Sequence, residues 1–381
     1  MTTNLDKLSP LILLSAGGSG GHLFPAEALA NELRNRGFRL AMVTDRRGGS
    51  LGKKIGVSDI YEVIASGVAG KSIFGRVISL ITIAAGTIQA RILLSRIKPT
   101  VVVGFGGYAS VPAMLAASYS SVATVIHEQN AILGRANRFL AKKAQLIAAS
   151  YTDIKQVPES ARGKVVHTGM PVRGAVNKFR NEPYKGIVEG KDIYLLIFGG
   201  SQGASVFSRV LPEAVERLSK KIREHLSLSH QARAEDCELL RQTYNRMGIN
   251  AEVATFFEDL PDRMSKAHLI ICRSGASTIA EVTTIGRPAI LVPFPYAIDD
   301  HQVANANVVD DAGGGWVIPD EVLSPEILSE RLDNLLSGKS DLEKAANQSK
   351  RLGCTNAAEQ LAEAVIGIVN RKSKIKNRDM R

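Results

Sequence analysis

Short apolar runs alternate with longer amphipathic segments along the first half of the chain. The runs typical of strands are 11–16, 39–44, 100–105, 122–127 and 145–149, and the amphipathic segments between them are 24–36, 74–97 and 109–118. Strands that are apolar on both faces and alternate with helices are typical of a parallel sheet that helices cover on both sides. The pattern therefore predicts a doubly wound α/β domain.

The same pattern restarts in the second half. Residues 169–190 contain glycines, prolines and a polar stretch, which is the composition of a linker. Beyond it, strands are predicted at 192–198, 225–230, 251–254, 268–272 and 288–292, with a helix over 203–222. We therefore predict two tandem Rossmann-like doubly wound domains, 1–170 and 171–354, with the active site in the cleft between them. A final helix at 355–371 could join the first domain.

Length and composition agree with two domains and exclude several classes. The chain has 381 residues, of which 45% are hydrophobic and 22% charged, enough for two cores. Its three cysteines, Cys237, Cys272 and Cys354, lack metal-ligand or redox spacing, so they fit a reducing cytosol and not a disulfide scaffold. No signal peptide or membrane span is predicted, because the longest charge-free apolar stretch, Val77 to Ala90, has 14 residues and a span needs about 20.

Positive charge is concentrated in the first half. Residues 1–172 contain 20 Lys and Arg against 9 Asp and Glu, whereas residues 173–381 contain 28 of each. This asymmetry indicates an anionic partner, either nucleic acid or a membrane surface. Aromatic residues make up 5% of the chain and do not alternate with basic ones, so the stacking platforms of a nucleic-acid-binding protein are missing. We therefore expect no nucleic acid partner and favour an anionic membrane surface.

Three glycine-rich turns each join a predicted strand to a predicted helix. They are Gly17–His22, Gly104–Tyr108 and Gly199–Gly203. Glycine allows the backbone to approach a ligand closely, and the N–H groups at the start of the following helix favour phosphate oxygens. Each turn could equally serve tight strand–helix packing, but three in one chain favour a phosphorylated ligand.

A nicotinamide-dependent dehydrogenase is the alternative for the first turn. Its G-x-G-x-x-G fingerprint would require glycine at position 23 after Gly18 and Gly20, and that position is Leu23. Asp45, at the end of the second strand, would be suitably placed for a ribose contact. The P-loop pattern is absent too, since no Gly-Lys-Ser/Thr follows these glycines. The mismatches weaken the dehydrogenase hypothesis but leave it open.

Seven short motifs follow one another along the chain. They are Gly17–His22, Gly104–Tyr108, His127-Glu128-Gln129-Asn130, Pro171-Val172-Arg173, Gly199–Gly203, Cys272–Ala276 with Glu281, and Val292-Pro293-Phe294 leading to His301-Gln302. In order and spacing they resemble the motifs of the MurG family of peptidoglycan glycosyltransferases, over nearly the whole chain. Met170 departs from the family's usual asparagine, and Ala232-Arg233 departs from the Ser/Thr-Gly that commonly follows His-Gln. The segment at Ala232 is therefore assigned no role.

The resemblance implies a GT-B fold of two Rossmann-like domains and an inverting transfer without a metal or cofactor. The donor would be UDP-N-acetylglucosamine, the acceptor undecaprenyl-diphospho-N-acetylmuramoyl-pentapeptide (lipid I), and the product lipid II. It also implies a peripheral enzyme on the cytoplasmic side of the bacterial inner membrane, with cell-wall synthesis and division proteins as partners. The alternatives are UDP-N-acetylglucosamine 2-epimerase, which has the same fold, and a non-enzymatic protein that binds anionic surfaces.

Two side chains are candidates for the general base of such a transfer. His22 is the leading one, because an imidazole titrates near neutrality and the residue follows the first predicted strand. Glu128 is the second candidate. His22 could instead cap the helix that starts near Leu23. A metal clamp is not expected, since Asp299-Asp300 and Asp310-Asp311 are adjacent pairs and no Asp-x-Asp motif follows a strand.

The resemblance assigns further residues to the two substrates. Donor contacts are implied for Ser19, Gly20, Gly21, Asn130, Arg173, Ser201, Phe257, Ala276, Ser277, Thr278, Glu281 and Gln302, and acceptor diphosphate contacts for Gly18, Gly106, Gly107 and Tyr108. Within the donor set, Arg173 and Ser201 would contact the diphosphate. Glu281 would accept hydrogen bonds from the ribose hydroxyls.

The other donor contacts follow from the same resemblance. Phe257 would contact uracil through its backbone, and Gln302 would contact the sugar hydroxyls, because an amide both donates and accepts. Ordinary structural roles are the alternatives. Asn130 could cap a turn, Arg173 could be a surface charge, and Glu281 could complement a helix dipole.

A segment near residue 74 combines apolar bulk with positive charge. Lys71, Ile73, Phe74 and Arg76 form the candidate membrane contact, because a polyprenyl-linked acceptor stays in the bilayer and an apolar patch ringed by cations is suited to bind there. Residues 77–94 could instead be a buried crossover helix. We expect both: most of the helix in the core, and its N-terminal end on the membrane.

Overall fold

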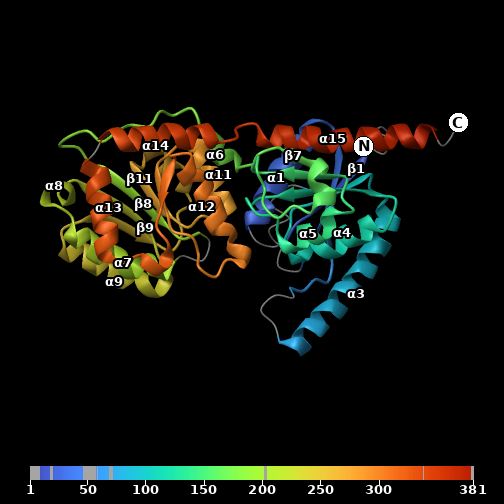
Figure 1. The fold of residues 1–381 in the computed structure, drawn as a ribbon, viewed down its shortest axis with the longest axis horizontal. Coiled ribbons are helices and arrows are strands. Elements are labelled where there is room, and N and C mark those ends of the chain that lie inside the picture. The colour runs from blue at the N-terminus through green and yellow to red at the C-terminus, as the bar shows by residue number, and fades with distance from the viewer. Residues whose placement is uncertain are drawn as a thin grey trace, which may run out of the picture. The chain divides into compact units, whose positions relative to one another are not determined.

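A computed structural model describes residues 9–17, 20–45, 57, 59–67, 72–200, 204–337 and 339–378, which fall into two compact units (Figure 1). Unit 1 comprises Met1–Arg173 and Asn356–Arg381, and unit 2 comprises Gly174–Thr355. Each unit contains a parallel sheet whose strands alternate with helices along the chain. The predicted α/β fold with two doubly wound domains is confirmed.

Unit 1 is built on one parallel sheet. Its strands in the described part of the chain are β1 (Leu11–Ser15), β2 (Arg39–Thr44), β3 (Asp59–Glu62), β4 (Val101–Gly104), β5 (Ala123–Glu128), β6 (Leu146–Ala149) and β7 (Val165–His167). Their order across the sheet is β3-β2-β1-β4-β5-β6-β7, and neighbouring strands are parallel. The sequence pattern does not predict β3 and β7, because these short edge strands are partly exposed and lack a longer apolar run.

Helices cover both faces of this sheet, because successive strand side chains point to opposite faces and both sets are apolar. The helical elements are α1 (Gly20–Asn35), α3 (Ile73–Ile97), η3 (Tyr108–Ser110), α4 (Val111–Ser118), α5 (Arg135–Ala141), η4 (Glu159–Lys164) and α15 (Ala357–Arg378). Ile12 and Leu14 of β1 belong to a core cluster with α1 and α15. Leu11 and Leu13 belong to a cluster with α4 and α5. The C-terminal helix α15 is therefore part of unit 1.

Helix α3 is exposed over most of its surface, so the expectation that most of it lies in the core is wrong. Its buried positions, Ser79, Gly86, Ala90 and Leu94, recur at helical spacing and form one narrow stripe. Close packing in this stripe requires glycine, since a Cβ on Gly86 would overlap the carbonyl oxygen of Ile64. The large apolar residues that the helix exposes are Phe74, Val77, Ile78, Leu80, Ile81, Ile88 and Ile92.

Unit 2 repeats the same sheet design. Its strands are β8 (Ile193–Phe198), β9 (Leu226–Gln231), β10 (Asn250–Ala254), β11 (Leu269–Cys272), β12 (Ala289–Leu291) and β13 (Gly315–Val317). They lie in the order β10-β9-β8-β11-β12-β13, and neighbouring strands are parallel. The helical elements are α6 (Gly174–Asn177), α7 (Ser205–Arg217), α8 (Lys220–Arg223), α9 (Ala234–Arg246), α10 (Leu260–Lys266), α11 (Ala276–Ile285), η5 (Ile298–Asp300), α12 (His301–Asp311), η6 (Asp320–Val322), α13 (Pro325–Ser337) and α14 (Lys339–Leu352).

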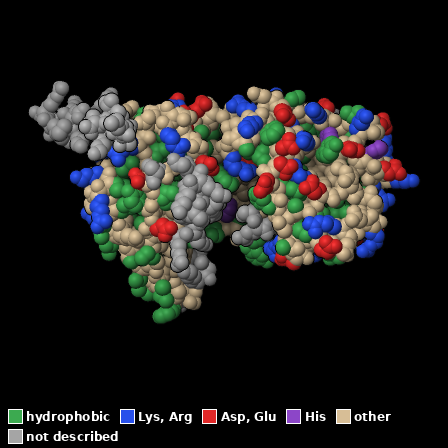
Figure 2. All heavy atoms as spheres, turned by 180° about the vertical axis from the view of Figure 1, so that it is seen from behind, with side chains coloured by type: hydrophobic (Ala, Val, Ile, Leu, Met, Phe, Trp, Pro, Cys, Tyr) green, Lys and Arg blue, Asp and Glu red, His purple; other side chains and the backbone are tan. Residues whose placement is uncertain are grey.

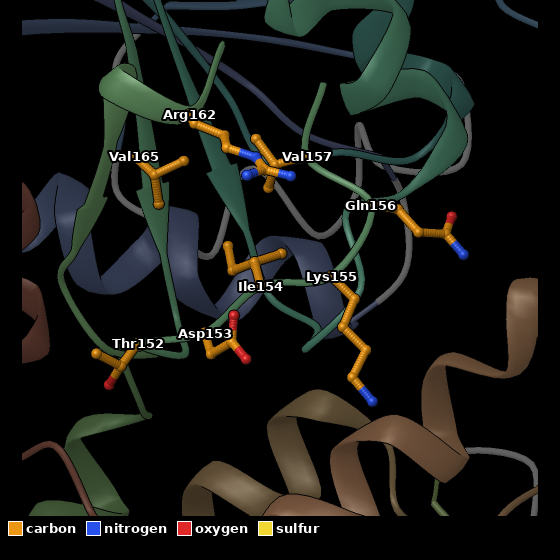
Figure 3. Close-up of a pocket in the computed structure, with 8 residues that line it drawn as sticks. All are labelled: Thr152, Asp153, Ile154, Lys155, Gln156, Val157, Arg162 and Val165. Atoms are coloured by element: carbon orange, nitrogen blue, oxygen red, sulfur yellow. The ribbon is translucent and has the colours of Figure 1, made fainter. Parts of the chain in front are cut away.

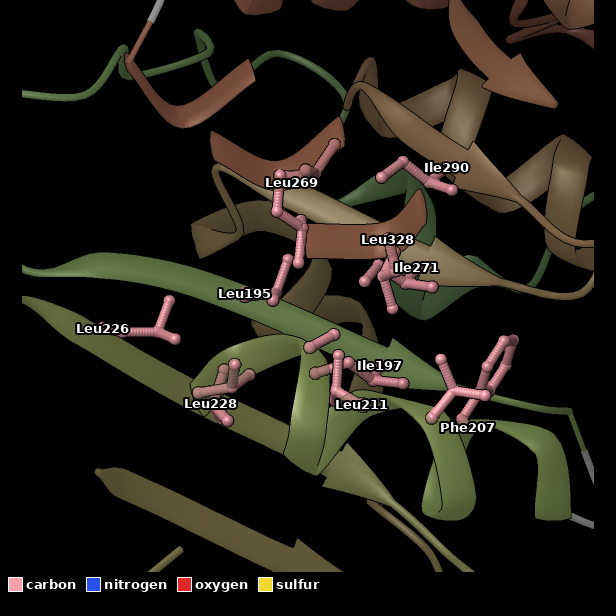
Figure 4. Packing of buried hydrophobic residues seen from close by; sticks show 14 of the residues in the cluster. Leu195, Ile197, Phe207, Leu211, Leu226, Leu228, Leu269, Ile271, Ile290 and Leu328 are labelled. Carbon is pink, nitrogen blue, oxygen red and sulfur yellow. The ribbon is translucent and has the colours of Figure 1, made fainter. Parts of the chain in front are cut away.

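The core of unit 2 lies between one face of its sheet and helices α7, α9 and α13. Leu195 and Ile197 of β8 pack with Leu228 of β9 and with Phe207 and Leu211 of α7 (Figure 4). The helix predicted over 203–222 is divided, because Leu218 has an extended backbone with φ −62° and ψ 151°. The apolar face of α7 therefore ends before α8 begins.

The strand order reverses at one point in each sheet. In unit 1 the chain first adds strands on one side of β1 and then continues with β4 on the other; in unit 2 the same change occurs between β8 and β11. Ligands of open α/β sheets bind outside the carboxyl ends of the strands at such points. Gly17 follows β1, Gly106 and Gly107 follow β4, and Gly199 and Gly200 follow β8, so these described residues of the glycine motifs lie where a ligand is expected in each unit.

Candidate active site

His22 of unit 1 packs against the glycine turn that follows β4. Gly106 and Gly107 have positive φ angles of 79° and 72°. A Cβ on Gly107 would lie 3.0 Å from His22 Cδ2 and 3.1 Å from His22 Nε2, and a Cβ on Gly106 would lie 3.5 Å from His22 Cε1. Glycine is therefore required both for the backbone conformation and for the close approach of the imidazole. Tyr108 follows directly, as the first residue of η3.

Glu128, at the end of β5, is 1% exposed and accepts four hydrogen bonds. Oε1 accepts from the backbone N–H of Asn130 at 3.0 Å and from its Nδ2 at 3.2 Å. Oε2 accepts from the backbone N–H of Gly134 at 2.9 Å and from Nδ2 of Asn137 at 2.7 Å. A carboxylate has about four acceptor positions, so this one is fully used. The arrangement argues against Glu128 as general base and leaves His22 as the stronger candidate.

A buried pair links the turn after β5 to the turn after β4. Gln129 Nε2 donates to the carbonyl oxygen of Phe105 at 2.7 Å and lies 3.1 Å from His127 Nδ1. Burial lowers the pKa of His127 to about 4, so its imidazole is neutral near pH 7. His127 and Gln129 are therefore structural partners of the site, which the motif contains but which the sequence does not distinguish from ligand-binding residues.

Arg173 packs on helix α1 of unit 1, which begins with Gly20 and Gly21. Its guanidinium carbon lies 5.0 Å from the centroid of the Phe24 ring. One turn along the same helix, burial raises the pKa of the Glu27 carboxyl, and the positive charge of Arg173 opposes that rise. Arg173 is thus held beside the helix that follows the first glycine turn.

In unit 2, hydrogen bonds join the turn after β11 to the turn after β12, to α12 and to η6, which follows β13. Arg273 Nη1 donates to Asp320 Oδ2 at 2.5 Å and to the carbonyl oxygen of Val292 at 3.2 Å. Ser274 Oγ donates to the carbonyl oxygen of Gln302 at 2.8 Å. These contacts gather three motif segments at the carboxyl edge of the sheet.

The side chain of Gln302 is partly engaged within the protein. Its Oε1 accepts from the backbone N–H of Phe294 at 3.0 Å. Gln302 can therefore offer a ligand the two donors of its NH2 group and the second lone pair of its oxygen. Just before it, Asp299 and Asp300 have positive φ angles of 55° and 52°, a strained backbone of the kind that clusters at ligand sites.

Helix α11 carries four of the residues assigned to the donor. Ala276, Ser277 and Thr278 form its first turn after Gly275 and are partly exposed, whereas Glu281 is 5% exposed. This first turn contains no acidic residue, so its N–H groups and the helix dipole favour an anionic ligand. The arrangement suits a phosphorylated molecule at the N-terminal end of α11.

Phe257 lies apart from these residues in the order of the sheet, because it follows β10 at one edge while α11 follows β11. It is 5% exposed, and the guanidinium carbon of Arg263 lies 4.1 Å from the centroid of its ring. Its side chain is therefore a packing element, which leaves only its backbone for a ligand. Four assigned residues, Gly18, Ser19, Lys71 and Ser201, lie outside the described residues, as does the side chain of Ile73.

The exposed apolar side of α3 forms a candidate membrane-facing surface. Figure 2 shows hydrophobic side chains gathered towards the N-terminal end of this helix. Phe74 is 76% exposed, and the exposed Arg76, Arg91 and Arg96 lie along the same helix. Within the described residues, the segment Phe74–Ile97 is the one helix long and apolar enough to cross a membrane, judged by length and composition alone.

A cavity of about 540 Å³ lies beside the segment that follows β6 (Figure 3). Apolar Ile154, Val157 and Val165 and charged Asp153, Lys155 and Arg162 line it, with Thr152 and Gln156. The backbone of Lys155 pairs with Ala131 and Leu133, so the cavity adjoins the turn that carries Asn130. None of the residues assigned to donor or acceptor lines it.

Two family models match the chain. The glycosyltransferase family 28 N-terminal domain matches residues 12–149, and the glycosyltransferase family 28 C-terminal domain matches residues 194–361. Each match falls within one unit, except for the first residues of α15. The two sheets thus correspond to the two domains of one glycosyltransferase family.

Similar proteins and structures extend over almost the whole chain. A Paramagnetospirillum magneticum protein named UDP-N-acetylglucosamine–N-acetylmuramyl-(pentapeptide) pyrophosphoryl-undecaprenol N-acetylglucosamine transferase is 47% identical over 97% of this chain and 100% of its own length. The crystal structure of Acinetobacter baumannii MurG is 29% identical and has a TM-score of 0.77, over 93% of this chain and 98% of its own. A Neisseria meningitidis UDP-GlcNAc 2-epimerase has a TM-score of 0.65 at 15% identity, over 94% of this chain and 100% of its own, which is a likeness of fold alone.

Proposed function

The chain belongs to the MurG family of UDP-N-acetylglucosamine–N-acetylmuramyl-(pentapeptide) pyrophosphoryl-undecaprenol N-acetylglucosamine transferases, and on that premise we propose that it transfers N-acetylglucosamine from UDP-N-acetylglucosamine to lipid I, forming lipid II. The observation that carries this proposal is the 47% identity with a protein of that name over the full length of the relative. Sequence similarity at this level favours the transferase over the 2-epimerase, whose likeness is limited to the fold.

We place the donor in unit 2. The N–H groups at the start of α11 face the UDP diphosphate, with Ser277 and Thr278 in the first turn. Glu281 accepts hydrogen bonds from the ribose. The NH2 group of Gln302 donates to the sugar, while its oxygen is held by the backbone N–H of Phe294. Positive charge at the leaving diphosphate comes from the helix dipole, with Arg173 as the cationic side chain.

We place the acceptor against the glycine turns of unit 1. The backbone at Gly106 and Gly107 receives the acceptor diphosphate, and Asn130 contacts the donor sugar. His22 accepts the proton of the acceptor hydroxyl while that oxygen bonds to C1 of N-acetylglucosamine and the bond from C1 to the UDP oxygen breaks. Attack from the face opposite UDP inverts the configuration at C1. The residues assigned to this scheme need no metal or cofactor.

We propose that α3 binds the cytoplasmic surface of the bacterial inner membrane. Its exposed apolar residues enter the headgroup region, and Arg76 and Arg91 meet anionic headgroups. The longest charge-free stretch of this helix has 14 residues, which favours binding at the surface over a span of about 20 residues. Cell-wall synthesis and division proteins are the expected partners at that surface.

Acceptor dependence of UDP release tests the proposed reaction. Purified protein incubated with UDP-N-acetylglucosamine should release UDP only when a lipid I analogue is present, and EDTA should leave the rate unchanged. His22→Ala should lower kcat about 100-fold or more, because a general base contributes at least that factor, while UDP binding by calorimetry stays intact. Release of UDP without an acceptor, or isomerisation of the sugar, would contradict the transferase and support the epimerase.

A further inference from the structure

The turn after β5 is held by one buried carboxylate. Glu128, Asn130, Gly134 and Asn137 form a set of contacts, called the β5 clamp below, in which Glu128 supplies the acceptors and the other three supply the donors. Glu128 is 1% exposed and Asn137 is 5% exposed. Because buried N–H groups without acceptors are costly, the clamp restricts the turn to one conformation.

The clamp connects strand β5 of unit 1, the turn that follows it and helix α5. Glu128 is the last residue of β5, Gly134 directly precedes α5, and Asn137 lies within α5. Oε2 therefore fastens α5 to the strand, while Oε1 holds both the backbone and the side chain of Asn130. A Cβ on Gly134 would lie 3.5 Å from Glu128 Oε2, an ordinary contact distance, so the carboxylate closes directly on this turn.

The same contacts leave little room for proton transfer. A general base must come within about 2.6–3.2 Å of the proton-bearing atom of its substrate. Both oxygens of Glu128 instead face N–H donors of the protein, at 2.7 to 3.2 Å. We propose that Glu128 is a positioning residue and not the general base, and that Asn137, which the motifs do not include, acts with it to orient Asn130 towards the donor sugar. The role of Asn130 in this inference rests on the proposed function.

Substitutions at Glu128 separate the two roles. Glu128→Ala removes the acceptors of all four hydrogen bonds, so kcat/KM should fall about 100-fold. Glu128→Gln keeps one oxygen for Asn130, and the Asn137 amide can turn to accept from the new NH2 group, so only the Gly134 N–H loses its partner. Its kcat/KM should stay within about 10-fold of the wild type, with an unchanged pH profile. A glutamine as inactive as the alanine would overturn the positioning role, since an amide cannot act as a base.

Asn137 provides an independent test. Asn137→Asp places a second carboxylate beside Glu128, so activity should fall sharply. The double variant Glu128→Gln/Asn137→Asp should regain activity, because the amide introduced at position 128 can donate to the carboxylate introduced at position 137. In an Asn130→Ala background, Glu128→Ala should cost much less than in the wild type, since the clamp acts through Asn130. Each pair of substitutions, at Glu128 with Asn137 and at Glu128 with Asn130, forms a double-mutant cycle. Additive effects on activity in both cycles would contradict the proposal. Glu159→Gln, an exposed acid of the same unit, is the matched control and should have wild-type activity.

Hydrogen exchange tests the clamp without any activity. Exchange at the amides of Asn130 and Gly134 should be slow in the wild type, much faster in Glu128→Ala, and intermediate in Glu128→Gln. UDP binding by each variant checks that unit 2 is folded. If the wild-type protein failed to transfer sugar but kept this exchange pattern, the proposed reaction would be wrong and the clamp would stand. Unchanged exchange at these amides in Glu128→Ala would show that Glu128 does not hold the turn, and the proposed clamp would be wrong.

Discussion

At the scale of single residues, the turn after β4 depends on glycine for two separate reasons. The positive φ angle of Gly107 would strain any other residue, and a Cβ there would lie 3.0 Å from the His22 ring. Gly37, at the end of α1, has a φ of 80° as well, but no atom lies within 4 Å of its Cβ position. Substitution of Gly37 therefore introduces backbone strain alone, whereas substitution of Gly107 introduces backbone strain and a contact with the imidazole.

We predict that Gly107→Ala and Gly37→Ala each lower the free energy of unfolding by about 1–3 kcal/mol, as expected for alanine at positive φ. Gly107→Ala should cost more, because its ψ of 158° lies in a region that essentially only glycine adopts and because the new methyl group meets His22. Only Gly107→Ala should also lower kcat, by about 10-fold or more, because the new methyl group displaces His22. Denaturant titration and the UDP-release assay measure the two effects. Equal kcat values for the two variants would argue against a catalytic role of the His22 contact.

At the scale of elements, α3 differs from the other long helices of unit 1 in how little of it is buried. One stripe, from Ser79 to Leu94, packs on the unit, and the remaining surface is largely apolar and exposed. Exposed apolar patches of this kind mark interaction surfaces. Arginines on the same helix favour an anionic bilayer as the partner.

We predict that Leu80→Asp/Ile81→Asp abolishes sedimentation with liposomes that contain anionic lipid, because these side chains are 58% and 64% exposed and would enter the headgroup region. Arg76→Glu should weaken the same binding more strongly at low salt than at high salt. Leu239→Asp on α9, where the leucine is 67% exposed, is the control and should bind normally. Normal binding by the α3 variants would move the membrane contact to another surface.

At the scale of the whole molecule, each unit has its own sheet, its own core and a buried histidine. His127 lies in unit 1 and His230 in unit 2, where His230 Nδ1 is 3.0 Å from the Tyr244 hydroxyl. Burial lowers the pKa of both imidazoles to about 4. In the unfolded chain a histidine has a pKa of about 6.5. Between about pH 4 and 6.5, the unfolded state therefore binds protons that the native state does not.

We predict that both units lose stability as the pH falls from about 6.5 towards 4, and that these histidines cause no change above that window. The slope is at most about 1.4 kcal/mol per pH unit for each histidine. Thermal unfolding across this range measures it. His230→Gln should flatten the dependence, whereas His167→Gln, an exposed histidine, should not change it. An unchanged slope in His230→Gln would show that other groups are responsible.

Local patterns predict those elements whose burial is uniform. β1, β2, β5 and β8 are apolar on both faces, so their ranges follow from the sequence to within about two residues, as does the alternation with helices that defines the fold. β3, β7 and β13 are short and partly exposed, so their residues resemble those of loops. The glycine motifs are recognisable for a similar reason, since a strand, a glycine turn and a helix start are neighbours in the chain.

Contacts between elements, in contrast, depend on the tertiary structure. Periodicity predicts helix α3 but cannot say that only a narrow stripe of it meets the sheet, because burial depends on what the fold places against each face. The glutamate in the His127–Asn130 motif resembles a catalytic acid or base, yet Asn137 and Gly134 fill its acceptor positions only once α5 packs beside β5. A residue type states which chemistry is possible, and the neighbours that folding supplies decide which part of it remains available.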